Sequence, residues 1–99
     1  MKKGKAWHLL AAWGVMPHNI DAILPENNEA ELQQRKQYIL AINECLKLLY
    51  RNGKEQKAFM HHPSKVVLLD GRKPIETITS GKIDDLALVH RSIRSMVCI

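Results

Sequence analysis

The stretch FMHHPSKVVLLDGRKPIETITSG, residues 59–81, decides how the last third of the chain folds. It contains four residues that interrupt regular helices, namely Pro63, Gly71, Pro74 and Gly81. A proline at the first position and a glycine just beyond the last are typical of a short helix, which predicts one over 74–80. Gly81 then predicts a left-handed residue that lets the next helix leave in another direction. The run Val66–Leu69 predicts either a loop that covers the core or a short edge strand.

The segment after this stretch predicts a terminal helix from Ile83 to about Met96. Acidic residues in its first turn and basic residues near its end suit the helix dipole: Asp84, Asp85, Arg91 and Arg94. Its expected buried stripe consists of Leu86, Val89, Ile93 and Met96. Leu88 is expected to point to the other side.

The longest predicted helix lies in the middle of the chain and ends at about Tyr50. Asn28 and Glu31 fit a capping box, in which the asparagine caps the helix and the glutamate reaches back. Apolar residues repeat along one side: Leu32, Tyr38, Ile39, Ile42, Cys45, Leu46 and Leu49. Other apolar residues lie off this stripe: Leu40, Ala41 and Leu48. We therefore expect this helix to be central to the domain and to form a homodimer contact.

Two short helices are predicted before the long one, over 3–13 and 17–24. Their apolar spacing is that of a helix-turn-helix. The second helix would offer His18, Asn19 and Asp21 to DNA, with no lysine or arginine. Two packed helices of a small core are therefore the favoured interpretation of this pair.

The residues predict an all-α fold. Asn52-Gly53 predicts a break after the long helix, followed by a short helix over 55–61 with Ala58 and Phe59 turned inward. The chain of 99 residues, with 45% hydrophobic and 25% charged residues, is typical of one small globular domain. We expect a compact single-domain helical bundle of about five to six helices with a long central helix. The helix-turn-helix-like pair would occupy 1–28, and the long helix with the C-terminal region would occupy 29–99.

The formal charge of +5 permits contact with nucleic acid or an acidic partner. The basic residues are dispersed, which favours a solvated surface. The candidates for a weak DNA contact are Lys2, Lys3, Lys5, Arg35 and Lys36. No apolar run approaches the roughly 18 residues that span a bilayer. The basic start precedes too short an apolar run for a signal peptide, so we expect a cytoplasmic protein without membrane contact.

The sequence predicts no catalytic, cofactor or metal site. The two cysteines, Cys45 and Cys98, lack a CxxC neighbour, and Cys45 falls in a buried helical pattern. Adjacent His61 and His62 would diverge on a helix, and His8 and His90 have no carboxylate or second histidine at helical metal-site spacing. Asp84-Asp85 fit a helix start better than a catalytic pair. We therefore expect a protein that is not an enzyme and needs no cofactor.

The C-terminal half shows an ordered set of motifs: Phe59-Met-His-His-Pro63-Ser64, Leu69-Asp-Gly71-Arg72-Lys-Pro74-Ile75, Ser80-Gly81 and a helix through Val89 to Ile93. This set resembles the toxin-binding domain of the Xre/MbcA/ParS antitoxin family. That family shows an aromatic residue before Pro-Asn, a Gly-Gly-Arg-x-Pro-Leu turn, a small-residue–Gly break and a terminal helix. The upstream helical pair and the long helix are also similar to that family.

The chain departs from the family pattern at several positions. Phe59 stands for the usual tryptophan, Ser64 for asparagine and Asp70 for the first glycine of the pair. The interval between Leu24 and the long helix is shorter than in that family, where it holds the recognition helix. The resemblance is therefore to a shortened form, in which DNA binding is weakened or lost.

The resemblance implies an antitoxin of a type II toxin–antitoxin pair. Such antitoxins bind RES-domain toxins that degrade NAD, and their C-terminal region occludes the active site of the toxin. The positions that the resemblance assigns to toxin binding are Arg72, Pro74, Gly81, Leu88, Arg91, Arg94, Met96, Val97 and Ile99. The second hypothesis is a helix-turn-helix-like regulator that binds its own promoter.

The residues themselves leave alternatives open at three of these motif positions. Gly71 and Pro74 also fit a purely structural role, in setting the turn and starting the helix. Arg72 can satisfy loop carbonyl groups as well as reach a partner. Leu88, Val97 and Ile99 are apolar residues outside the predicted buried stripe, as an interaction surface requires.

Overall fold

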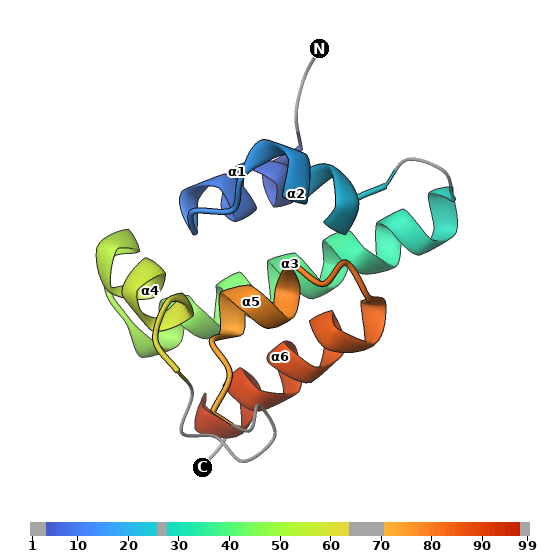
Figure 1. Cartoon of the computed structure of the whole chain (residues 1–99). Coiled ribbons are helices and arrows are strands. Elements are labelled where there is room, and N and C mark those ends of the chain that lie inside the picture. The colour runs from blue at the N-terminus through green and yellow to red at the C-terminus, as the bar shows by residue number, and fades with distance from the viewer. Residues whose placement is uncertain (1–3, 26–27, 64–70, 98–99) are drawn as a thin grey trace.

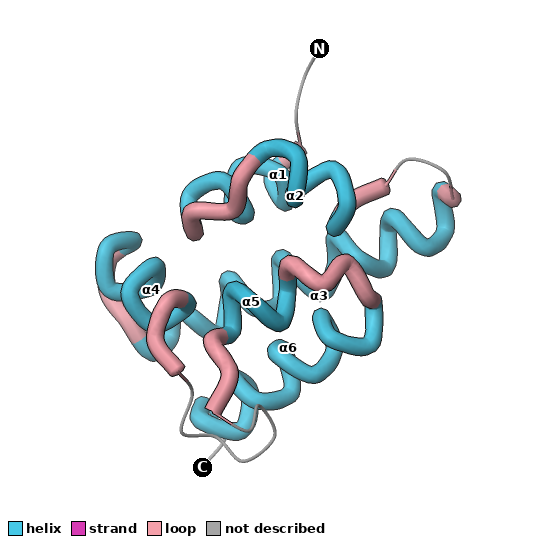
Figure 2. The backbone as a smooth tube through the Cα atoms, viewed as in Figure 1, coloured by secondary structure: helices cyan, strands magenta, loops and turns pink. Residues whose placement is uncertain are grey.

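The structure, a computed structural model, describes residues 4–25, 28–63 and 71–97. These residues form six helices and no strand, which confirms the all-α prediction with its long central helix (Figures 1 and 2). The helices are α1 (Lys5–Ala12), α2 (Pro17–Ile23), α3 (Glu29–Leu49), α4 (Gly53–Met60), α5 (Pro74–Ile78) and α6 (Ile83–Val97). Val66–Leu69, which predicts a loop or an edge strand, lies outside the described residues.

Asparagine side chains cap the N-terminal ends of α3 and α4. Asn28 Oδ1 accepts a hydrogen bond from Glu31 N at 3.1 Å, and Asn52 Oδ1 accepts one from Glu55 N at 2.9 Å. Each bond satisfies a backbone N–H group that has no partner within its helix. The predicted capping box forms only in part, because the Glu31 carboxylate accepts hydrogen bonds from Arg35. The Asn52 cap also places the start of α4 at Gly53, two residues before the predicted start.

The helices pack around α3. Helix α6 lies beside α3, α1 packs on α3, and α5 packs on α6. Figure 1 shows the α1–α2 pair on one side of α3 and α6 on the other, with α5 in front of α3 and α4 next to the C-terminal end of α3. Helices α3 and α6 run in the same direction in this view, and α5 runs in the opposite direction.

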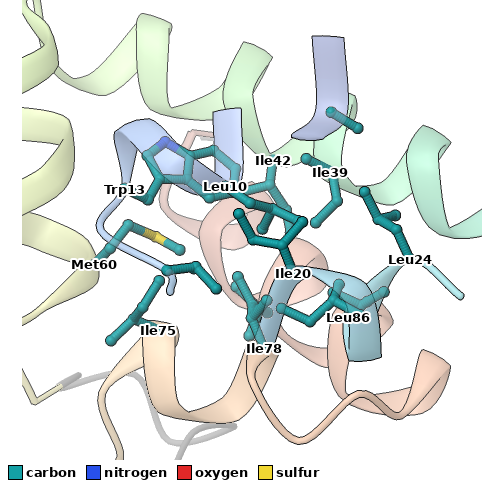
Figure 3. Packing of buried hydrophobic residues seen from close by; sticks show 14 of the residues in the cluster. Leu10, Trp13, Ile20, Leu24, Ile39, Ile42, Met60, Ile75, Ile78 and Leu86 are labelled. Carbon is teal, nitrogen blue, oxygen red and sulfur yellow. The ribbon is translucent and has the colours of Figure 1, made fainter. Parts of the chain in front are cut away.

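All six helices contribute to one apolar core (Figure 3). Its fully enclosed side chains include Leu10, Ile20, Ile39, Ile42, Met60, Ile78 and Leu86. Burial of one such side chain stabilises the fold by about 1.5–3 kcal/mol. In α4 the buried residue is Met60, whereas Ala58 is exposed, so the inward position predicted for Ala58 is wrong. The core closes here because α4 contacts α5.

The buried face of α6 differs from the predicted stripe at two positions. Leu86, Val89 and Ile93 are fully buried as predicted, but Met96 is 38% exposed. Leu88 is half-buried and packs against the core, so the prediction that it points away is wrong. The buried face is wider on this side because Ser92, whose hydroxyl donates to Leu88 O at 2.8 Å, is also buried.

Arg35 connects three separate parts of the chain. Its side chain is buried in α3, and Nη1 donates to the backbone oxygen of Ile23 at 3.1 Å and to that of Gly81. Nε and Nη2 donate to Glu31 Oε1 at 3.2 and 2.8 Å. The guanidinium group, carried by α3, therefore joins this helix to the end of α2 and to the turn between α5 and α6.

The turn that supplies one of these carbonyl groups requires glycine. Gly81 has φ +78°, the left-handed conformation predicted for it. A Cβ atom at this position would also lie 3.2 Å from the backbone oxygen of Ala22. Close approach of this turn to α2 brings Gly81 O within reach of Arg35.

Replacement of Arg35 by methionine should lower the free energy of unfolding by about 3 kcal/mol, because the buried carbonyl groups of Ile23 and Gly81 lose their donor. Methionine retains much of the apolar stem, so the change reports mainly on the hydrogen bonds. Urea denaturation followed by circular dichroism measures the difference. The matched control is Lys36→Met at the neighbouring half-buried position, for which the change should stay within about 0.5 kcal/mol. Equal denaturation midpoints for the two variants would show that the guanidinium group does not hold the fold together.

Candidate interaction surface

The outer side of α6 exposes two arginines. Arg91 and Arg94 lie one turn apart and are exposed, and neither forms a salt bridge with a described residue. Met96 follows them with 38% of its surface exposed, and Val97 is half-buried. Because Met96 is two positions after Arg94, about 200° further round the helix, the arginines and the methionine lie on different sides of the last turns of α6. The end of this helix therefore exposes both charged and apolar side chains to a partner that surrounds it. We call these three residues, Arg91, Arg94 and Met96, the α6 surface.

The segment before α5 lies on the same side of the molecule. The turn over 79–82 reverses the chain, so that α5 and α6 run in opposite directions and contact each other. The residues that precede α5 are therefore near the C-terminal half of α6. Arg72 is exposed in this segment, as a residue that contacts a partner must be.

Two of the residues that the resemblance assigns to toxin binding have structural roles. Pro74 is buried at the first position of α5, so it is not available to a partner and its assignment as a contact is wrong. Gly81 directs its carbonyl oxygen to Arg35, and its glycine character is explained by the left-handed turn. Leu88 is half-buried against the core, and Ile99 lies outside the described residues.

The candidate DNA contacts that the structure describes differ in exposure. Arg35 is 7% exposed and bonded to backbone carbonyl groups, so its prediction as a DNA contact is wrong. Lys5 is exposed at the start of α1, whereas Lys36 is half-buried on α3. Lys2 and Lys3 lie outside the described residues. The exposed side of α2 presents His18 and Asp21, which adds no positive charge to this set.

A signal for the role of Arg35 is present in the sequence. Leu32, Arg35, Ile39 and Ile42 follow one another at spacings of three and four residues, which is the period of a buried helical face. An arginine at such a position must find buried hydrogen-bond acceptors. The carbonyl groups of Ile23 and Gly81 meet that need.

Charges are distributed unequally between the two ends of the molecule. Because α3 and α6 run in the same direction, their N-terminal ends gather acidic residues: Glu29, Glu31, Asp84 and Asp85. Their C-terminal ends and the following helix α4 gather basic residues: Lys47, Arg51, Lys54, Lys57, Arg91 and Arg94. Each helix dipole favours this arrangement. We call these regions the acidic end and the basic end.

A histidine and a tyrosine meet between α3 and α6. The rings of His90 and Tyr38 are 6.0 Å apart and tilted by 55°. Burial lowers the pKa of His90 from its ordinary value, and the positive charge of Arg94 lowers it further. His90 therefore favours the neutral form in the folded protein.

The described residues contain no group of three or more histidine, cysteine, aspartate or glutamate side chains placed to hold a metal ion. Cys45 is half-buried and packs against the core from α3. Within the described part of the chain, no helix combines the length and apolar character needed to cross a membrane. Comparisons with protein-family models, curated proteins and solved structures found no match to this chain.

The free energy of unfolding should fall as the pH is lowered through the ordinary histidine range. A histidine whose pKa is depressed on folding binds its proton more readily in the unfolded chain, so acid favours unfolding until the folded form is protonated as well. Chemical denaturation at several pH values measures the slope. His90→Gln should reduce that slope, whereas His18→Gln at an exposed position of α2 should have a smaller effect. Equal slopes for His90→Gln and the parent protein would contradict the role of His90.

Proposed function

We propose that the protein is a non-catalytic antitoxin that binds a RES-domain toxin and occludes its active site. The observation that carries this proposal is the α6 surface, in which the last turns of one helix expose two arginines on one side and a methionine on another. The motif resemblance at residues 59–96 supplies the class of partner. The partner would present acidic groups to Arg91 and Arg94, and an apolar site to Met96.

The position of the α6 surface in the last turns of α6 suits an occluding element. Arg94 and Met96 lie in the last turn of α6, beyond the buried residues of that helix. A helix end that projects from a packed core can enter a cleft without disturbing the fold. Binding alone would inhibit the toxin, since no chemical step by the antitoxin is needed, and both proteins would act in the cytoplasm.

We further propose that the antitoxin forms a homodimer through α3. Leu48 supports this proposal, because it is 73% exposed on the face of α3 that does not contact the core. The half-buried residues Leu40 and Ala41 extend the apolar character of that face. Leu48→Lys should shift the sedimentation equilibrium towards the monomer, because a charge at the centre of such an interface is desolvated without a partner. An unchanged mass would contradict a dimer contact at Leu48.

Reversal of the two α6 charges should release the toxin. The variant Arg91→Glu/Arg94→Glu should weaken binding to a co-expressed RES-domain toxin by about 100-fold or more, because two desolvated charge pairs become repulsive. Affinity is measured with purified proteins, and cellular NAD is measured during co-expression as the readout of inhibition.

The matched control reverses two charges elsewhere, at Lys36 and Lys82. Lys36→Glu/Lys82→Glu should still bind the toxin and preserve cellular NAD. A second variant that ends at Arg94 removes Met96 and the residues after it, and should fail to protect the cell. Protection by the shortened chain, or by the variant with reversed arginines, would overturn the proposal.

The second candidate function is a DNA-binding regulator that acts on its own promoter. The observation that favours it is the net charge of +5, with Lys5 exposed at the start of α1. Binding would be strongest at low salt, because phosphate contacts release counterions. A gel-shift assay with the promoter at low salt tests it, and no shift would exclude it.

A further inference from the structure

Helix α4 presents a row of basic side chains along one side. Lys54, Lys57 and His61 follow one another at spacings of three and four residues, so they lie on the same side of the helix. All three are exposed, as is Arg51 just before the helix. We call these four residues the α4 surface.

The helix that carries the α4 surface is fixed at both ends. Asn52 caps its start through the backbone of Glu55, and Gln56 Nε2 donates to Tyr50 O at 3.3 Å. Met60 is fully enclosed by the core, and the ring of Phe59 lies 5.5 Å from that of Tyr50. The basic side chains therefore extend from a rigid element.

The turn between α1 and α2 fits closely against this surface. His61 Nε2 donates to the backbone oxygen of Trp13 at 2.7 Å. Gly14 has φ +94°, and a Cβ atom there would lie 2.9 Å from His61 Nε2 and 3.2 Å from Lys57 Cε. Glycine at this position lets the stem of Lys57 lie along the turn. Lys57 as a whole remains exposed, as is usual for a lysine whose stem packs and whose ammonium group is hydrated.

The positive charges of this surface are not neutralised within the fold. Among the described residues, Arg51, Lys54 and Lys57 form no salt bridge. Glu55 is the acidic residue of α4, and its position on the helix is off the row of Lys54, Lys57 and His61. The surface therefore has an excess of positive charge that a polyanion would neutralise.

We propose that the α4 surface binds the phosphate backbone of a nucleic acid without reading its sequence. Lys54 and Lys57 are about 4.5 Å apart along the helix axis. Their flexible side chains can therefore bind neighbouring phosphate groups, which follow one another at about 3.4 Å per strand along a duplex. Lysine ammonium groups bind phosphate as point charges and require no particular base.

A nucleic acid fits this surface better than a protein does. Stable protein interfaces are centred on buried apolar or aromatic anchors. The large hydrophobic side chains that the described residues expose are Met16, Leu48 and Met96, none of which belongs to α4. This surface is separate from the α6 surface, so the inference goes beyond the proposed function.

The test measures fluorescence anisotropy of a labelled DNA duplex of arbitrary sequence as the full-length protein is added at several salt concentrations. The parent protein should bind at low salt, with affinity that falls as salt rises. Lys54→Gln/Lys57→Gln should bind about 10-fold more weakly or worse. The slope of log affinity against log salt concentration should become shallower by about 2, because two phosphate contacts and their released counterions are lost.

The matched control is Lys73→Gln/Lys82→Gln, which removes the same charge from the residues just before α5 and α6. It should keep most of the affinity, and circular dichroism should show that both variants are folded. Equal loss in both variants would show a response to net charge alone and would overturn the proposal, as would absence of binding by the parent protein at low salt. Labelled polyglutamate serves as a further probe, and equally tight binding that depends on Lys54 and Lys57 would overturn the assignment to nucleic acid.

Discussion

A guanidinium group that is removed from water must have its hydrogen bonds satisfied by the protein, and the arrangement around Arg35 follows from this constraint. Its charge is balanced by Glu31, and its remaining donors reach the carbonyl groups of Ile23 and Gly81. Ile23 is the last residue of α2, and Gly81 lies two residues before the start of α6. The end of the N-terminal pair and the start of the terminal helix are consequently held to the same point of α3, which fixes the direction in which α6 leaves the core.

Helix positions and caps could be predicted from the sequence because they depend on local chemistry. Asn28, Pro17, Pro74 and Gly81 act within a few residues of their own positions, and the structure agrees with each of these predictions. Partners distant in the chain could not be predicted in this way. The spacing of Arg35 along α3 indicates that it is buried, but the carbonyl group of Gly81 reaches it only through the tertiary fold.

The candidate surfaces were predictable to different degrees, because some depend on local helix chemistry and others on contacts between distant parts of the chain. Arg91 and Arg94 are exposed because α6 is amphipathic, which its sequence period already indicates. The burial of Pro74 and the half-burial of Leu88 depend on how α5 packs against α6 and on the width of that contact. The helical spacing of Lys54, Lys57 and His61 is visible in the sequence. Their contact with the turn at Gly14 could not be predicted, because that turn lies far away along the chain.

The parallel course of α3 and α6 gives the molecule an acidic end and a basic end along a longest dimension of 37 Å. At physiological ionic strength the electrostatic screening length is about 8 Å. The charges at one end therefore contribute almost nothing to the electrostatic potential at the other end. Each end interacts with other molecules independently. At 0.01 M salt the screening length grows to about 30 Å. The molecule then behaves as a single electric dipole, which favours head-to-tail alignment of one copy with the next.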